Sequence, residues 1–117
     1  GEIMIIYCGV GDCIHNECNY CETETVEINK NGQCIAMGKV RPEVIKFAKL
    51  MEKVLRRHDY KGGWKNCTGN FLLAKIQEEC NELTRAMKSN SRKDIIDECA
   101  DLANICMMIA DIWSSQN

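Results

Sequence analysis

The sequence predicts a mainly α-helical protein, an antiparallel helical bundle completed by oligomerisation, with a small cysteine-rich β-hairpin element at its N-terminus. Two observations support this fold class. From residue 42 onward, hydrophobic residues recur with the period of α-helices in three segments joined by short connections. Before that point the chain shows strand and turn patterns, and five of the nine cysteines lie in its first 34 residues. This change in composition predicts two parts, residues 1–38 and residues 39–117.

Length and charge narrow the class of protein. The chain has 117 residues, enough for one modest domain or a small domain with an appendage. Its formal net charge is −2, which argues against a polycation that binds nucleic acid. The apolar run at residues 3–7 is too short for a signal peptide or a membrane span. We therefore expect a soluble, cytoplasmic protein with no nucleic-acid or membrane partner.

The first part of the chain is expected to form a hairpin. Residues 25–28 alternate in polarity, and Asn31-Gly32 is a strong signal for a two-residue type I′ turn. Residues 33–36 then provide the returning strand.

The first helix is expected to begin at Pro42, because proline is favoured at the first helical position, and to end near Asp59. Gly62 and Gly63 follow and interrupt the helical pattern. One face of this helix is predicted to carry Val44, Phe47, Ala48, Met51, Val54, Leu55 and His58.

Two further helices are separated by a turn at residues 89–91. The first of them is expected to begin at residues 68–70, and Ser91 with Asp94 resembles a capping box at the start of the other. The predicted apolar stripes are Leu72, Leu73, Ile76, Cys80, Leu83 and Met87, then Ile95, Cys99, Leu102, Cys106, Ile109 and Trp113. The cysteines on these stripes are expected to behave as small hydrophobic residues.

Two acidic half-motifs lie on these successive helices, Glu79-x-x-Glu82 and Glu98-x-x-Asp101. They are symmetric about Asn90, so a helical hairpin sets Glu82 beside Glu98 and Glu79 beside Asp101. Four carboxylates beside an apolar core repel one another unless cations lie among them, and oxygen ligands of this kind suit Mg²⁺ or Mn²⁺. For any single glutamate the alternative is a solvated charge at the border of the core.

The order Glu-x-x-Glu, fifteen intervening residues, Glu-x-x-Asp resembles the signature of the MazG-like all-α nucleotide pyrophosphohydrolases. The flanking segments 72–83 and 95–104 and the preceding Gly-Gly-Trp-Lys sequence at 62–65 are also similar, so the resemblance covers about residues 42–113. It implies Mg²⁺-dependent cleavage of a nucleoside triphosphate to the monophosphate and pyrophosphate by a dimer or tetramer. The implied role is removal of unwanted nucleotides from the nucleotide pool (housecleaning). The implied catalytic and metal-binding residues are Glu79, Glu82, Glu98 and Asp101.

Two other residues are candidates for substrate binding. Trp64 is expected either to stack on a base or to cap the end of the bundle, and Lys75 either to meet a phosphate or to form an ion pair. The alternative to an enzyme is a non-catalytic, zinc-stabilised helical adaptor or a nucleotide-sensing module. The base and sugar preference, the choice between dimer and tetramer, and the carboxylate that acts as base stay open at this stage.

The N-terminal cysteines predict a second, structural metal site. Four thiolates satisfy tetrahedral Zn²⁺, and the spacing singles out Cys8, Cys13, Cys21 and Cys34. Cys18 or His15 can replace one of these ligands, and the alternatives to zinc are a redox-active thiol cluster or core cysteines. The Cys-x₄-Cys-x₇-Cys start resembles a short cysteine-rich bacterial domain of uncharacterised function, which implies no activity.

Overall fold

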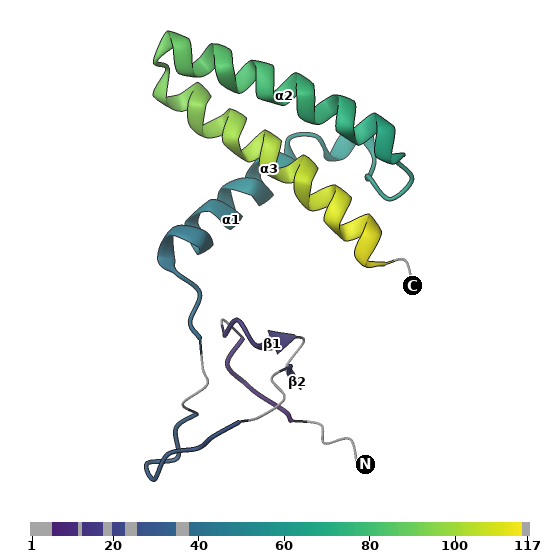
Figure 1. The fold of residues 1–117 in the computed structure, drawn as a ribbon. Helices are drawn as coiled ribbons and strands as arrows, with labels where there is room; N and C mark the ends of the chain where they lie inside the picture. The colour runs from purple at the N-terminus through teal and green to yellow at the C-terminus, as the bar shows by residue number, and fades with distance from the viewer. Residues whose placement is uncertain (1–5, 12, 18–19, 23–25, 35–37, 116–117) are drawn as a thin grey trace. The chain divides into compact units, whose positions relative to one another are not determined.

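A computed structural model describes residues 6–11, 13–17, 20–22, 26–34 and 38–115. The chain divides into two compact units, Gly1–Ile45 and Lys46–Asn117, which are treated separately below (Figure 1). The boundary predicted after residue 38 lies a few residues before this division, which falls inside the first helix, α1 (Pro42–Arg56).

The first unit contains a short antiparallel pair, β1 (Asn16–Glu17) and β2 (Tyr20–Cys21). An isolated bridge joins Tyr7 to Tyr20, and their two rings lie 5.1 Å apart between centroids. This pair is the main strand pairing among the described residues of the unit, and it precedes the hairpin expected from the sequence.

The chain turns at Asn31-Gly32, but the expected two-residue type I′ turn is not formed, because Asn31 lacks the positive φ that this turn requires. The N–H of Gly32 instead bonds to the backbone oxygen of Asn29, and the strands around the turn are reduced to an isolated bridge between Ile28 and Cys34. The side chain of Asn29 organises the turn, since its oxygen accepts hydrogen bonds from the backbone N–H groups of Asn31 and Gln33. Gly32 has a φ of +79°, a conformation that favours glycine. Residue 25 of the predicted first strand and residues 35 and 36 of the second lie outside the described residues.

In the second unit, α1 ends at Arg56 and is followed by a short 3₁₀ turn, η1 (Asp59–Lys61). Gly62 then has φ +87° and ψ −179°, a combination that is essentially restricted to glycine. The helix expected to extend to about residue 59 therefore ends slightly earlier, and the two glycines turn the chain toward the next helix as expected.

Helices α2 (Gly69–Ser89) and α3 (Arg92–Ser114) form an antiparallel hairpin and run side by side (Figure 1). Thr68 caps α2, because its hydroxyl accepts the backbone N–H of Phe71 at 3.2 Å. The tight turn uses Asn90 in the left-handed conformation, with φ 55°. Ser91 occupies the N-cap position of α3 but makes no side-chain capping bond, so the capping box expected there is not formed.

Fewer residues of α2 and α3 are buried than the predicted apolar stripes contain. Its buried members include Leu72 and Ala86 on α2 and Ala100 and Ile105 on α3. Several residues expected in the core are exposed instead: Leu73, Cys80 and Met87 on α2, and Cys106 and Trp113 on α3. The apolar stripe is thus wider than the surface that one hairpin partner can cover.

The C-terminal turns of α1 pack against α3. Val54 is 3% exposed, and the Nδ2 atom of Asn104 donates a hydrogen bond to the backbone oxygen of Met51 at 3.1 Å. The prediction of a mainly helical protein with a small N-terminal β-hairpin is confirmed. Among the described residues, no helix has both the length and the apolar character that a membrane crossing requires.

Candidate active site

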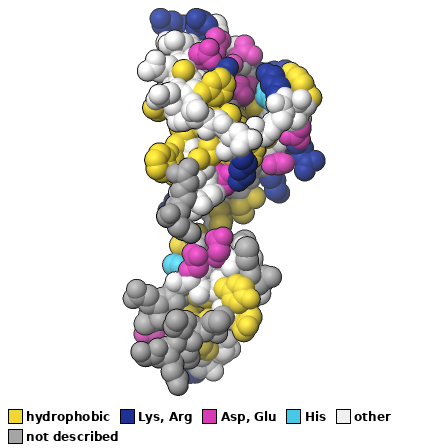
Figure 2. Space-filling model, turned by 90° about the vertical axis from the view of Figure 1, so that its right-hand side faces the viewer, with side chains coloured by type: hydrophobic (Ala, Val, Ile, Leu, Met, Phe, Trp, Pro, Cys, Tyr) yellow, Lys and Arg dark blue, Asp and Glu magenta, His cyan; other side chains and the backbone are white. Residues whose placement is uncertain are grey.

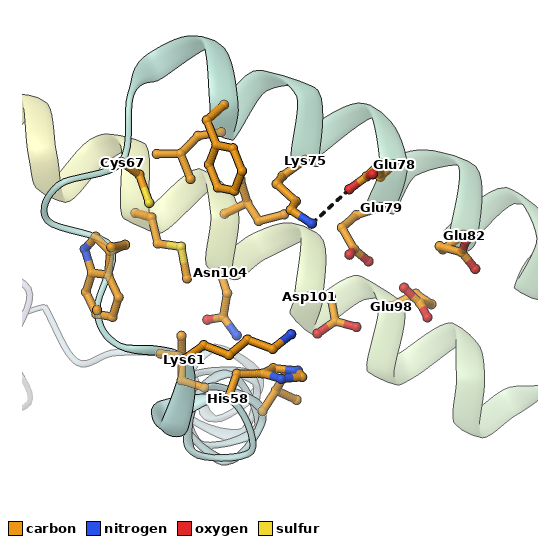
Figure 3. Close-up of a pocket in the computed structure, with 18 of the residues that line it drawn as sticks. His58, Lys61, Cys67, Lys75, Glu78, Glu79, Glu82, Glu98, Asp101 and Asn104 are labelled. Carbon is orange, nitrogen blue, oxygen red and sulfur yellow. Dashed lines mark ion pairs between the residues drawn. The ribbon is translucent and has the colours of Figure 1, made fainter.

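Three of the four predicted acids come together between α2 and α3. Glu79 on α2 and Glu98 and Asp101 on α3 each offer a carboxylate oxygen, and these oxygens lie within 4.8 Å of one another. Figure 3 shows the three carboxyl groups pointing into a common space. The arrangement follows from local structure, because residues three apart share one side of a helix and the short turn brings the two helices into register. We call these three residues the acidic cluster.

Glu82, the fourth predicted acid, lies outside the acidic cluster. Its carboxylate forms an ion pair with Arg85 at 2.5 Å, one turn further along α2. Glu82 still lines the same pocket, and its negative charge acts on Glu98. The structure therefore leaves Glu82 beside the cluster instead of within it.

Crowding of the carboxylates changes their protonation. The pKa of Glu98 is raised from 4.5 to about 7, first by burial and then by the adjacent Glu79 carboxylate, with smaller contributions from Glu82 and Asp94. Burial and the charge of Glu98 also raise the pKa of Asp101, although His58 and Arg57 oppose this. Placing a negative charge on all three carboxylates at once is therefore unfavourable in the absence of a cation.

This electrostatic situation fits a divalent cation. The Oε2 atom of Glu98 is buried and makes no hydrogen bond within the part of the chain that the structure describes. A buried carboxylate oxygen without a partner is costly, and a cation coordinated by several carboxylates removes that cost. Hard oxygen donors of this type suit Mg²⁺ or Mn²⁺. The acidic cluster is accordingly consistent with a divalent-metal site.

A pocket of about 1000 Å³ surrounds the acidic cluster and extends away from it along the helices. Apolar and aromatic side chains also line it, with Phe71 and Leu72 about two turns before Glu79 on α2 and Met108 about two turns after Asp101 on α3. Trp64, from the loop before α2, is a further lining residue. Carboxylates at one end and apolar side chains at the other suit an elongated ligand that is anionic at one end and aromatic or apolar at the other.

Both predicted substrate-binding residues line this pocket. Trp64 is half-buried, and its indole N–H donates to Asp111 at 2.9 Å. Lys75 forms an ion pair with Glu78 at 3.1 Å, which Figure 3 marks with a dashed line. Its ammonium group also lies 5.8 Å from the centroid of the Phe71 ring. The partner of Lys75 is thus the carboxylate three residues away, and Glu79 is left to the acidic cluster.

Asn104 is a pocket residue that the sequence predictions missed. It is only 3% exposed, and while its Nδ2 atom bonds to Met51, its Oδ1 atom has no hydrogen-bond partner among the described residues. In Figure 3 it lies beyond Asp101, on the side away from Glu98. The signal was available, because Glu98, Asp101 and Asn104 follow one another at intervals of three residues and so share one side of α3.

The predicted zinc ligands do not form a comparable group. Cys13 is buried and its sulfur accepts the backbone N–H of Gly38 at 3.4 Å, whereas Cys8, Cys21 and Cys34 are half-buried. No three of these four sulfurs lie close enough together to share a metal ion in the described structure, where the acidic cluster is the grouping that meets this condition. The zinc site therefore stays a prediction.

Comparison with known proteins agrees with this geometry. A protein of Archaeoglobus fulgidus, itself uncharacterised, is 32% identical over 70 residues, which cover 60% of this chain and 75% of that protein. No solved structure matches significantly. The sequence profile of the phosphoribosyl-ATP pyrophosphohydrolase family matches residues 44–111, more than half of the chain and the whole of the region that carries the four acids. The chain therefore belongs to the phosphoribosyl-ATP pyrophosphohydrolase family, within the MazG-like all-α pyrophosphohydrolases.

Proposed function

We propose that this protein is a Mg²⁺-dependent pyrophosphohydrolase that cleaves a nucleoside triphosphate to the monophosphate and pyrophosphate. The observation that carries the proposal is the acidic cluster, three carboxylates within 4.8 Å of one another inside a pocket large enough for a nucleotide. Membership of a pyrophosphohydrolase family agrees with it.

Glu79, Glu98 and Asp101 are the proposed metal ligands, with Mn²⁺ as an alternative to Mg²⁺. Glu82 is proposed as the fourth. Its ion pair with Arg85 is exposed, with 48% of the Glu82 side chain and 70% of the Arg85 side chain accessible. An exposed pair of this kind contributes at most about 1 kcal/mol, so a rotation of Glu82 toward the cluster has a small cost.

The chemistry assigned to this site is hydrolysis between the α- and β-phosphates. A divalent cation held by the acidic cluster would neutralise phosphate charge and would lower the pKa of the attacking water. A carboxylate of the site that is not fully engaged by the metal would accept the proton from that water. Lys75, which lines the pocket beside Glu78, supplies a positive charge for the phosphates, and the apolar end of the pocket with Trp64 accommodates the nucleoside.

We also propose that the enzyme is a homo-oligomer, a dimer or a tetramer. Large hydrophobic side chains remain exposed on α2 and α3, among them Leu73, Met87, Ile96 and Trp113. In Figure 2 hydrophobic side chains are visible at the surface of the helical unit between charged ones. Association through such side chains would bury part of the apolar stripe that the single hairpin leaves open.

The proposal is tested with purified protein, Mg²⁺ and a panel that contains the ribo- and deoxyribonucleoside triphosphates and phosphoribosyl-ATP. Release of pyrophosphate from at least one of them is expected, and addition of EDTA should abolish it. Glu98→Gln should remove activity, whereas the matched control Glu52→Gln should not, because Glu52 forms an exposed ion pair with Arg56 away from the pocket.

Two outcomes would contradict the proposal. Failure to hydrolyse any member of the panel would exclude the enzyme. Mg²⁺-dependent binding of a nucleotide without hydrolysis would instead favour the alternative, a nucleotide-sensing module.

A further inference from the structure

A contact between distant parts of the chain holds the loop that precedes α2. The Nε1 atom of Trp64 donates a hydrogen bond to Oδ2 of Asp111 at 2.9 Å, across 47 residues of sequence. Lys65, the next residue, forms an ion pair with the same oxygen of Asp111. Asp111 lies near the C-terminal end of α3, so this helix restrains the loop at two consecutive residues.

The restrained loop forms one wall of the pocket. Its lining members are Lys61, Gly62, Gly63, Trp64 and Cys67. Two consecutive glycines leave the backbone of this segment with few intrinsic restraints, and a β-carbon built on either glycine would meet no neighbouring atom. The position of Trp64 is therefore fixed by its contacts with Asp111, because the local sequence alone restrains it little.

The same contacts define how the indole ring is held. The ring N–H is bound to Asp111, and the Lys65 ammonium lies 5.8 Å from the ring centroid. Lys65 and the indole N–H lower the pKa of Asp111, so this residue is a carboxylate at neutral pH and a strong acceptor. An indole anchored through its one donor presents a flat apolar surface in a defined orientation, which is what a stacked nucleobase requires.

We propose that Asp111 is a positioning residue that holds Trp64 in the pocket wall so that the indole contacts the nucleobase of the substrate. The inference rests on the proposed nucleotide pyrophosphohydrolase function and adds to it the group that orders the nucleoside end of the pocket. Asp111 itself does not touch the phosphates, and its effect passes through Trp64.

Binding measurements test this separately from catalysis. In a Trp113→Phe background Trp64 is the sole tryptophan, so its fluorescence reports on its own surroundings. The ligands are α,β-methylene-ATP and its GTP, CTP and UTP counterparts with Mg²⁺, and inorganic triphosphate as a ligand without a base. We expect nucleotide binding to change Trp64 fluorescence, and Asp111→Leu to raise the Kd of the tightest-binding analogue on the order of tenfold. The Kd of inorganic triphosphate should stay within about twofold.

Three companion variants sharpen the assignment. Asp111→Asn keeps an oxygen that can accept the indole N–H and should restore most of the affinity. Lys65→Met removes the exposed ion pair with Asp111 and the ammonium near the indole ring but keeps the Trp64 hydrogen bond, and it should change the Kd less than about threefold. Trp64→Phe keeps an aromatic ring without the N–H, and adding Asp111→Leu to it should weaken binding little further, because the two residues act through one hydrogen bond.

The outcomes separate this inference from the proposed function. An unchanged Kd in Asp111→Leu, an equal loss for inorganic triphosphate, or additive effects in the double variant would overturn the positioning role while leaving the pyrophosphohydrolase intact. In kinetics the role predicts a raised KM with a nearly unchanged kcat. A wild-type protein that neither binds nor hydrolyses any nucleotide would instead contradict the function on which the inference rests.

Discussion

Replacement of Glu98 by glutamine should stabilise the metal-free protein above neutral pH. In the native structure the pKa of Glu98 is raised from 4.5 to about 7, mainly by burial and by Glu79. A shift of that size corresponds to about 3 kcal/mol when the group is fully shielded from solvent. Glu98 is half-buried, so screening reduces the expected effect to about 1–2 kcal/mol. Glutamine removes the charge and keeps a side chain of nearly the same size.

The pH dependence follows from the direction of the shift. Because the pKa is raised on folding, Glu98 binds its proton more tightly in the native state, and its stabilising contribution is fully present below about pH 4.5. That contribution is lost as the pH rises to about 7 and stays lost above it. Wild type should therefore lose stability relative to Glu98→Gln between about pH 5 and pH 8 in EDTA.

Urea denaturation followed by circular dichroism measures this difference at matched protein concentration. Contributions from groups common to both proteins cancel in the comparison. Glu52→Gln is the control, since this exposed residue forms a surface ion pair with Arg56. The stability of this variant should follow that of wild type within about 0.5 kcal/mol from about pH 5 to pH 8. Parallel pH profiles for wild type and Glu98→Gln would refute the reasoning, because they would show that Glu98 carries no raised pKa in the folded protein.

The remaining predictions concern metal, packing and the N-terminal element. Mg²⁺ at about 100 times its Kd should stabilise wild type by about 2.7 kcal/mol and should stabilise Glu98→Gln far less. Equal thermal unfolding midpoints of wild type in Mg²⁺ and in EDTA would contradict metal binding. Asn104→Ala should lower the free energy of unfolding in urea by roughly 1–2 kcal/mol, because it removes the hydrogen bond to Met51 and leaves a small cavity. An unchanged free energy of unfolding would show that this bond is not formed. Leu72→Ala should lower the free energy of unfolding by about 2–5 kcal/mol, because Leu72 is buried. Leu73→Ala should hardly change the free energy of unfolding of a monomer, but it should weaken the oligomer as measured by light scattering. Equal losses of stability in the two variants would contradict the observed burial. If the four predicted cysteine ligands bind zinc, elemental analysis of protein purified under reducing conditions should give one zinc per chain, and its absence would exclude the site.

The helices and the grouping of the acids are largely local properties of the sequence. Periodic hydrophobic residues, Pro42, Thr68 and the turn at Asn90 place three helices close to where they occur. Spacing of three residues puts Glu98 and Asp101 on one side of α3, and the short turn brings α2 alongside. Such features depend on a few neighbouring residues and a rigid periodic backbone, so they can be read from the sequence.

Other features depend on how elements far apart in the sequence pack against one another. Only the tertiary structure separates Glu82 from the acidic cluster, pairs Trp64 with Asp111 across 47 residues and places Asn104 against the backbone of α1. It also decides which edge of each apolar stripe is buried, since Leu72 is covered and Leu73 is exposed. Helical periodicity defines the direction of each side chain around its own axis, but the crossing of the helices and the path of the intervening loop determine what that side chain meets.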